Sequence, residues 1–165
     1  MIEVRPTRPD EWERMRRLRH AALTDAPSAF AEVLAESEAL SEEVWRRRTT
    51  PTDLQVTLVA TDDESMVGMC AVIRDAVTDQ ARLVAVWVDP AHRGQGVAAS
   101  LIEAAIAWCE RLRVGYLTTA VNETNLPAAA AYRNAGFAET GGRKPMPSHP
   151  GHFEIDLSRP IGSGR

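Results

Sequence analysis

A glycine-containing turn in the middle of the chain carries the clearest chemical signal. Arg93, Gly94, Gln95 and Gly96 follow a β-branched run and precede a stretch of helical periodicity that begins at Val97. The first turn of a helix offers unpaired backbone N–H groups and the positive end of the helix dipole, and both favour an anion. Glycine lets the main chain approach that anion closely, and Arg93 can add a charge-assisted contact. We therefore predict an anion site at this turn.

The turn does not identify the anion by itself. The second glycine is not followed by lysine and a hydroxyl residue, so this is not a Walker phosphate loop. A dinucleotide fingerprint needs three glycines within a parallel βαβ unit. Glycines before a helix also serve tight turns and close packing without any ligand. Taken alone, the segment leaves ligand binding and a structural turn open.

A second informative segment lies downstream. Asn125 precedes a short predicted helix, and Tyr132 follows seven residues later, before Gly136 and Phe137. A tyrosine hydroxyl can donate a hydrogen bond or a proton, and an asparagine amide can contact a polar ligand. The alternatives are a core tyrosine packed between helix and sheet, and an asparagine that caps the helix or forms a turn.

Together the two segments resemble the signatures of the GNAT superfamily of N-acetyltransferases. Arg93-x-x-Gly96-x-Ala98 is similar to the family's acyl-CoA signature, which is Arg or Gln, two residues, Gly, one residue, then Gly or Ala. Segment 122–137, with its asparagine, short helix, tyrosine and Gly-Phe, is similar to a second family segment in the right order. The opening is more loosely similar in Ala-Pro-Ser-Ala-Phe, Trp45 and Arg48, so the resemblance covers residues 2–157.

The resemblance implies an acetyl-CoA-dependent N-acetyltransferase that acylates a primary amine of an unidentified small molecule or peptide by direct, sequential transfer. It implies that the main chain of Val86, Trp87 and Val88 holds the pantetheine arm as an added half-strand, and that Asn125 contacts the pantetheine or amide region. Tyr132, near the thioester sulfur, is the implied catalytic residue. The alternative function is a non-catalytic acyl-CoA-binding sensor or interaction module. The backbone N–H groups implied to take the pyrophosphate belong to Gly94, Gln95, Gly96, Val97, Ala98 and Ala99.

Acyl transfer needs a hydrogen-bond donor for the oxyanion and a proton or hydrogen bond for the departing thiolate. A main-chain N–H at Trp87 or Val88 suits the first need, and Tyr132 suits the second. Reference pKa values of about 10 for tyrosine and about 8.5 for a thiol make full proton transfer uphill by roughly 2 kcal/mol, so we expect hydrogen bonding with late or concerted transfer. The predicted strand 116–121 carries no acid, and we assign no general base; the alternatives are backbone-bound water, Asp89, Glu123, His149 and His152.

The two cysteines do not suggest a catalytic or metal site. Cys70 and Cys109 lie in apolar runs without the spacing that a zinc site needs. We expect two buried, reduced thiols, no metal, and no acyl-enzyme on cysteine.

The surrounding pattern predicts an α/β (α+β) domain with the GNAT fold: a mixed, mostly antiparallel sheet of about seven strands flanked by about four helices. Short links between the runs 55–61, 66–74 and 82–89 indicate an antiparallel meander. We expect one domain, residues 1–158, and a C-terminal tail, residues 159–165. Further strands are predicted at 2–6, 116–121, 137–143 and 152–157, and helices at 10–23 with Asp10 as cap, from 41 to before Pro51, at 97–112 and at 127–134.

Composition is that of a soluble globular protein, and the formal net charge of −4 argues against a nucleic-acid partner. Apolar runs are too short for a secretory signal or a membrane span, so the expected compartment is the cytoplasm. Arginines cluster at 14–19 and 46–48 among glutamates, which predicts solvated helix faces. The small acidic excess slightly favours a cationic acceptor. The superfamily resemblance makes a homodimer plausible.

Overall fold

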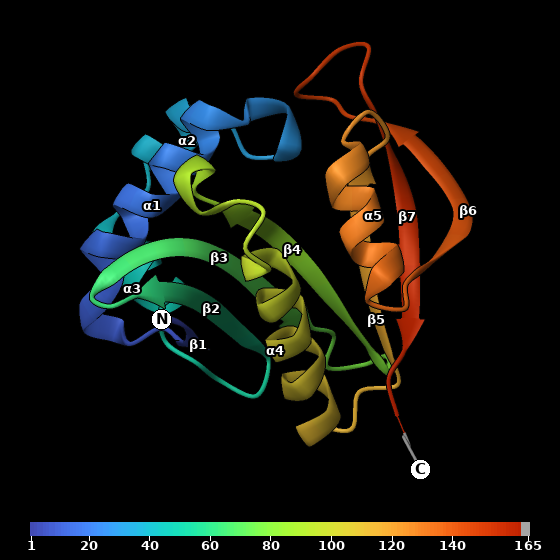
Figure 1. The fold of residues 1–165 in the computed structure, drawn as a ribbon, viewed down its shortest axis with the longest axis horizontal. Coiled ribbons are helices and arrows are strands. Elements are labelled where there is room, and N and C mark those ends of the chain that lie inside the picture. The colour runs from blue at the N-terminus through green and yellow to red at the C-terminus, as the bar shows by residue number, and fades with distance from the viewer. Residues whose placement is uncertain (163–165) are drawn as a thin grey trace.

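One sheet organises residues 1–162, the part of the chain that the computed structural model describes (Figure 1). The order of its seven strands is β1-β2-β3-β4-β5-β7-β6, and every neighbouring pair is antiparallel except β4 and β5, which are parallel. The strands are β1 (Ile2–Pro6), β2 (Gln55–Asp62), β3 (Ser65–Arg74), β4 (Gln80–Val88), β5 (Tyr116–Asn122), β6 (Ala138–Pro145) and β7 (Phe153–Pro160).

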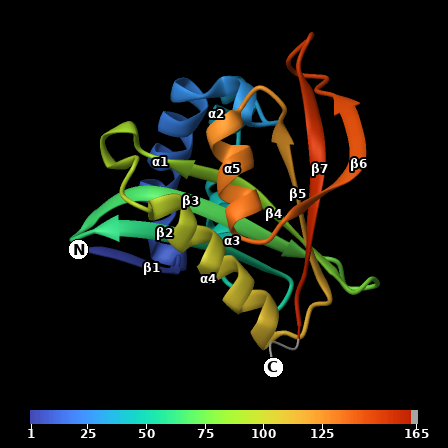
Figure 2. The same ribbon diagram turned by 45° about the vertical axis from the view of Figure 1, so that its right-hand side comes forward.

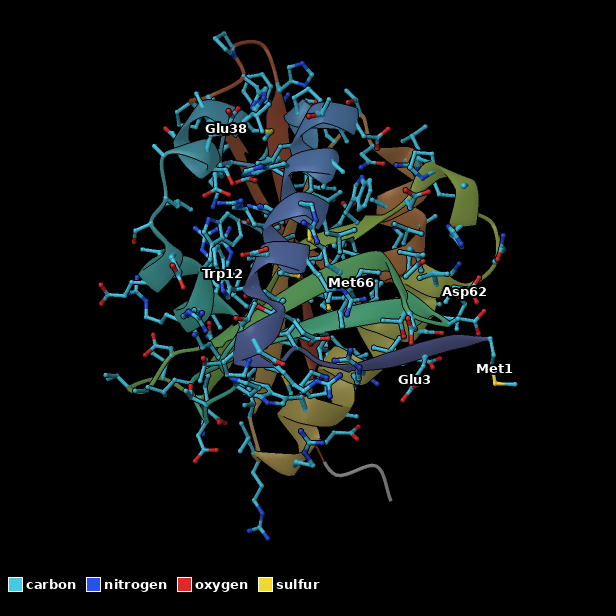
Figure 3. The ribbon with its side chains drawn as sticks, turned by 90° about the vertical axis from the view of Figure 1, so that its left-hand side faces the viewer. Met1, Glu3, Trp12, Glu38, Asp62 and Met66 are labelled. Atoms are coloured by element: carbon cyan, nitrogen blue, oxygen red, sulfur yellow. The ribbon has the colours of Figure 1, made fainter. Side chains whose placement is uncertain are left out.

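Helices cover both faces of this sheet (Figures 1 and 2). Within the described residues the α-helices are α1 (Trp12–Asp25), α2 (Leu34–Glu38), α3 (Glu42–Arg48), α4 (Val97–Arg111) and α5 (Leu126–Asn134), and the 3-10 turns are η1 (Pro9–Glu11), η2 (Pro27–Ala29) and η3 (Pro90–His92). Figure 3 looks onto the face that α1 crosses. Helices α4 and α5 pack on the other face.

Two apolar cores result, one on each face. On α4, buried residues such as Leu101 and Ala105 recur at helical spacing and pack with Tyr132 of α5. On the opposite face, Met15 and other residues of α1 pack against β2, β3 and β4. Side chains alternate along a strand, so neighbours on β3 contribute to different cores: Cys70 faces α4, whereas Met69 faces α1.

Gly68 of β3 marks a close approach between α4 and the sheet. A methyl group added there would lie 3.1 Å from the Trp87 carbonyl oxygen, 3.2 Å from Leu101 Cδ1 and 3.3 Å from Val97 Cγ1. These separations are tighter than ordinary van der Waals contact. The missing side chain therefore lets the first turn of α4 lie directly against β3 and β4.

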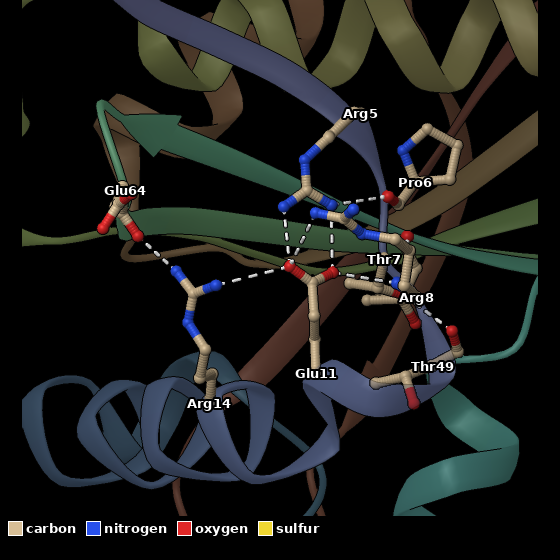
Figure 4. A network of polar contacts seen from close by, with 9 residues as sticks. Arg5, Pro6, Thr7, Arg8, Glu11, Arg14, Thr49 and Glu64 are labelled. Carbon is tan, nitrogen blue, oxygen red and sulfur yellow. Dashed lines mark hydrogen bonds and ion pairs between the residues drawn. The ribbon is translucent and has the colours of Figure 1, made fainter.

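A buried carboxylate joins β1 to the start of α1 (Figure 4). Glu11 accepts hydrogen bonds from the two terminal nitrogens of Arg5 at 2.9 and 2.6 Å and from the Arg8 backbone N–H at 2.9 Å. Arg14 lies 3.4 Å from the same carboxylate and donates to the Glu64 carbonyl in the β2–β3 turn. The Arg5 hydrogen bonds lower the pKa of Glu11 from its ordinary 4.5 to about 2, although burial opposes them.

The predicted class and the mixed sheet of about seven strands are confirmed, as are the positions of the main helices. The additional helix is α2, five residues long, in a stretch that showed no clear periodicity.

The first helix begins later than predicted, and Asp10 does not cap it. Pro9 opens the 3-10 turn η1 instead, and α1 starts at Trp12 without a side-chain cap. The Arg8 N–H, just before this turn, bonds to the Glu11 side chain, which closes η1 and leaves α1 without a side-chain cap.

The last strand is longer than predicted. It continues to Pro160, where Tyr116 of β5 is its register partner, and Ile161 is buried. The end of the predicted tail, residues 163–165, lies outside the described residues.

Candidate active site

A cleft opens where β4 and β5 separate. Within the described residues the two strands pair only at Gln80–Tyr116, Ala81–Leu117 and Arg82–Thr118, near their N-terminal ends. Figure 2 shows them diverging beyond this point. The resulting cleft has a volume of about 420 Å³ and is lined by residues from α1, η2, α3, the central strands and α5. It therefore reaches through the sheet from the α1 side to the α5 side.

A bulge on β4 shapes one wall of this cleft. The β3–β4 register shifts between Met69 and Ala71, and opposite the shift Ala85 has a φ of +59°. Beyond it the Asp89 N–H bonds to the Val67 carbonyl on β3. Backbone groups alternate along a strand, so those of Trp87 also face β3, while those of Val86 and Val88 face the open edge.

The glycine turn forms a helix start that no side chain covers. Gly94 and Gly96 have φ values of +75° and +80°, which favour glycine, and an added Cβ at either position would meet nothing within 4 Å. Gly96 is the N-cap of α4, and the first helical bond runs from the Ser100 N–H to its carbonyl. The N–H groups that the helix leaves unpaired belong to Val97, Ala98 and Ala99. Gln95 is exposed beside them.

Arg93 is engaged by the protein itself. Its Nε donates to the Val88 carbonyl at 3.0 Å, and its terminal nitrogen pairs with Asp25 at the end of α1. The indole N–H of Trp87 donates to the same carboxylate at 2.9 Å. These hydrogen bonds, that of Trp87 first, lower the pKa of Asp25. Arg93 thus joins the turn to α1, and its half-exposed side chain still lies beside the bare helix start.

Tyr132 lies in the cleft with little solvent contact. Its exposed fraction is 6%, and its ring packs edge-on against Phe137 with centroids 5.6 Å apart. Burial raises the pKa of Tyr132 to about 12, while a hydrogen bond with Thr119 acts in the opposite sense. Thr119 itself donates to the Leu83 carbonyl on β4 at 2.9 Å, so it joins the two strands that border the cleft.

Asn125 caps a helix and also lies at the cleft, the two alternatives that the sequence left open. It is the N-cap of α5, where its side-chain oxygen accepts from the Ala128 N–H at 3.3 Å. It also lines the cleft, as Ala128 and Tyr132 do. Capping uses the amide oxygen, which leaves the amide nitrogen for other contacts.

Sequence reasoning missed Asn122, a buried amide at the end of β5. Its oxygen accepts from the Thr124 N–H at 3.0 Å, which fixes the amide nitrogen as a donor. That nitrogen lies 3.2 Å from the Ser28 carbonyl and 2.8 Å from Nδ1 of His152. His152 therefore accepts at Nδ1. The partners come from η2 and from the link before β7, so no local spacing could have revealed the group.

None of the four side chains considered as general bases lines the cleft; they are Asp89, Glu123, His149 and His152. The carboxylates that do line it are those of Glu32 and Glu154. Glu123 is bound by Arg143 through two contacts of 2.8 Å, and this hydrogen bonding lowers its pKa. Asp89 accepts from the Ala91 N–H at 2.9 Å.

The expectation of solvated arginines fails for two of them. Arg19 and Arg48 both bind Glu32, at 2.9 and 3.0 Å, and line the cleft. Burial would raise the pKa of Glu32, but the Arg48 hydrogen bond and the charge of Arg19 outweigh it, and the pKa is lowered. The glutamates among them along the chain predicted a solvated face, whereas their actual partner, Glu32, comes from the loop before α2.

Cys70 and Cys109 are free and buried, as predicted. Burial raises the pKa of both thiols, that of Cys109 to about 11. Among residues 1–162, no cluster of three or more His, Cys, Asp or Glu side chains could hold a metal ion. In the same residues no helix has the length and apolar character needed to cross a membrane.

A sequence model of the Acetyltransferase (GNAT) family matches residues 12–137, which include the whole of the glycine turn, Asn125 and Tyr132. The chain belongs to the GNAT acetyltransferase family. Its mixed sheet, split between β4 and β5, is the GNAT fold.

Individual relatives support this membership. Peptidyl-lysine N-acetyltransferase YjaB of Salmonella typhimurium is 29% identical over 148 residues, which are 86% of each chain. Streptothricin acetyltransferase of Streptomyces lavendulae is 33% identical over 79 residues, which are 48% of this chain but only 42% of that protein. A GNAT acetyltransferase from Streptococcus pneumoniae has the same fold, with a TM-score of 0.83 over 98% of this chain and 100% of that one, at 17% identity.

Proposed function

We propose that this protein transfers the acetyl group of acetyl-CoA to a primary amine. One observation carries the proposal: a single cleft is bordered by the open edge of β4 as far as Val86 and by the buried Tyr132, and β4 leads on along the chain to the uncapped start of α4. The named relatives differ in acceptor, one being a peptidyl-lysine N-acetyltransferase and the other a streptothricin acetyltransferase. They support amine acetylation and leave the acceptor open.

Two parts of the site suit two parts of acetyl-CoA. The uncapped N–H groups of Val97, Ala98 and Ala99, beside two glycines with open space around them, suit a pyrophosphate. The open edge of β4 suits an extended pantetheine arm that adds to the sheet, because the main-chain groups of Val86 and the N–H of Val88 have no β5 partner there, although the Val88 carbonyl already accepts from Arg93. The main chain of Trp87 faces β3 and is not available to this arm. Trp87 contributes instead through the packing of its side chain and the hydrogen bond from its indole N–H to Asp25.

When bound, acetyl-CoA supplies the acetyl group as a thioester. A neutral acceptor amine attacks the carbonyl and forms the N–C bond, and the C–S bond breaks with the electron pair leaving on sulfur. The nitrogen gives up one proton to solvent to become the amide, and the CoA thiolate takes up a proton from solvent as it departs. The Val88 N–H on the open edge donates to the oxyanion, and Tyr132 donates to the sulfur. With a tyrosine pKa of about 12, full proton transfer to a thiolate with a reference pKa near 8.5 is uphill by roughly 5 kcal/mol. Tyr132 therefore acts mainly as a hydrogen-bond donor.

The pyrophosphate seat is tested by a charge placed at the helix start. Gly96→Asp puts a carboxylate where the phosphates bind, and Gly96→Asn puts a neutral side chain of the same shape on the same left-handed backbone, which Asn and Asp tolerate best after glycine. We expect calorimetric titration to show acetyl-CoA affinity roughly a hundredfold or more weaker in the Asp variant than in the Asn variant, because like charges then oppose at the seat.

Equal affinities in the two variants would contradict the assignment. Release of free thiol, measured across a panel of amines and corrected for hydrolysis, then separates the two functions that use this site. Turnover with an amine supports the transferase. Tight acetyl-CoA binding without turnover of any amine supports a sensor or interaction module.

A further inference from the structure

One wall of the cleft carries a charged group that the proposed acetyl transfer does not use. Arg19 of α1 and Arg48 of α3 bind opposite oxygens of Glu32, with hydrogen bonds of 3.0 Å each. Both guanidinium groups also lie over aromatic rings: Arg19 is 4.6 Å from the Phe30 centroid and Arg48 is 5.0 Å from that of Trp45. All five residues line the cleft, so the two guanidinium groups are held in place at its surface.

The group is not electrically balanced. Two arginines share one carboxylate, and the side chains of Arg19 and Glu32 are only 14% and 16% exposed. Of the other charged residues lining the cleft, Glu154 has its own partner in Lys144 at 3.6 Å, and Arg82 lies at the exposed end where β4 and β5 pair. Arg19 and Glu32 are mostly buried and pair with each other, so the surplus charge lies on the partly exposed Arg48, where an anion in the cleft can compensate it. One arginine would be enough to neutralise Glu32.

Unused hydrogen-bond donors point to the same conclusion. Among residues 1–162, Nε and Nη1 of Arg48 and Nη1 of Arg19 have no hydrogen-bond partner. The indole N–H of Trp45 is buried without a partner among these residues as well. The Arg48 side chain remains 37% exposed, so its fork is within reach of a molecule in the cleft. A guanidinium fork binds a carboxylate bidentately.

We propose that Arg48 and Arg19 bind a carboxylate on the acceptor, and that the acceptors are therefore free amino acids. The proposal rests on the proposed acetyl transfer and names its substrate class. A cleft of about 420 Å³ that connects these arginines with Tyr132 suits a small amine with an anionic group at one end. The local charge thus outweighs the overall charge of −4, which slightly favoured a cationic acceptor.

The test compares matched acceptors that differ only in the carboxylate. Each of several L-amino acids is paired with its own carboxamide, and kcat/KM is measured by thiol release from acetyl-CoA. We expect the acids to exceed their amides by roughly ten- to a hundredfold, the worth of a charge-assisted hydrogen bond. Arg48→Gln should reduce this acid-to-amide ratio by at least tenfold, and Arg48→Lys should reduce it less. Equal ratios in the native protein and in Arg48→Gln would overturn the proposal.

Two further variants separate binding from a merely structural role. Arg46→Gln lies on the same helix but removes a surface pair with Glu42, so it should leave the ratio unchanged. Glu32→Gln removes the internal carboxylate that competes for the same arginines, so it should raise the ratio. If the group is purely structural, Arg48→Gln and Glu32→Gln should both lower stability. They should not then shift the acid-to-amide ratio in opposite directions.

A binding measurement keeps the two proposals distinct. The CoA-loaded protein is titrated calorimetrically with each acid and amide. If acetyl-CoA binds and amides or simple amines are turned over as well as acids, the amino-acid proposal fails while acetyl transfer stands. If acids bind more tightly than amides, with Arg48 required, the anion site stands even when no transfer occurs. If acids and amides are equal both in turnover and in binding, the anion site is refuted.

Discussion

At Tyr132, the environment of one hydroxyl determines which catalytic role the residue can play. Burial raises its pKa to about 12. Such a tyrosine stays protonated at physiological pH and above, so it remains a donor throughout the range in which an acceptor amine becomes neutral. The rise of activity with pH should therefore report the amine and its surroundings, with no loss from Tyr132 until the solution is strongly alkaline.

Tyr132→Phe removes this donor while keeping the ring that packs on Phe137. We expect kcat to fall roughly a hundred- to a thousandfold, the usual contribution of a positioned acid, with acetyl-CoA affinity nearly unchanged. Steady-state kinetics and calorimetry measure the two quantities, and circular dichroism checks the fold. Normal turnover by a folded variant would remove Tyr132 from the mechanism.

The sequence was informative about residues whose neighbours along the chain reveal them. The glycine turn before α4 and the Asn125–Tyr132 spacing are local patterns, and the helix start and the N-cap appear where those patterns predicted them. Asn122 and Glu32 were missed because their partners come from distant segments: Asn122 contacts Ser28 and His152, and Glu32 joins Arg19 to Arg48. Only tertiary folding brings such groups together.

At the scale of the elements, the bulge on β4 puts one residue in an unfavourable backbone conformation and in doing so opens the cleft. Ala85 has a left-handed backbone, which an L-residue other than glycine rarely adopts. The extra residue moves the backbone groups of Val86 and Val88 to the open edge. The sequence predicted this strand but not its bulge, since alanine carries none of the signal that a glycine would have given.

Ala85→Gly should relieve the unfavourable backbone conformation. We expect the free energy of unfolding to rise by roughly 0.5–1 kcal/mol, measured by urea titration. Ala71→Gly on β3, at a position without a positive φ, is the control and should lower the free energy of unfolding by a similar amount. Destabilisation by both substitutions to the same extent would show that Ala85 is not strained.

The Glu11 cluster makes the junction of β1 and α1 sensitive to acid. The pKa of Glu11 is about 2 in the folded protein and 4.5 ordinarily, so its stabilisation is complete above about pH 4.5 and is lost as pH falls toward 2. Glu11→Gln should lower the free energy of unfolding at neutral pH by roughly 2–3 kcal/mol and flatten its dependence on pH in that window.

Urea titrations at a series of pH values measure this effect. Glu42→Gln, which removes an exposed pair with Arg46, is the control and should change stability by less than about 0.5 kcal/mol. An undiminished acid dependence in Glu11→Gln would assign the loss of stability to other carboxylates.

At the scale of the whole molecule, the sheet consists of two parts with a narrow connection. Strands β1 to β4 form one part and β5, β7 and β6 the other. In the described residues β4 and β5 have three register pairs, to which the Thr118 and Thr119 hydroxyls add hydrogen bonds to β4 carbonyls. The composition and periodicity of the strands predicted how many there would be. They could not predict this division, because it depends on where two non-adjacent runs stop pairing.

A ligand that fills the cleft should therefore stiffen the connection. We expect acetyl-CoA to slow amide exchange at Leu83 and Thr119, which border the cleft, more than at residues within the β2–β3 pair. At a hundred times its Kd it should also raise the free energy of unfolding by about 2.7 kcal/mol. Hydrogen exchange with mass spectrometry measures how much exchange slows in each strand. Equal slowing in all strands would contradict the prediction.

The position of β7 has a consequence for the synthesis of the protein. This strand follows β6 in the chain but lies between β5 and β6 in the sheet, and β6 has no other neighbour there within residues 1–162. While the ribosome is still adding β7, β5 has an open edge toward the missing strand and β6 has no partner. The nascent chain thus has an unpaired sheet edge until β7 emerges, and such an edge favours aggregation.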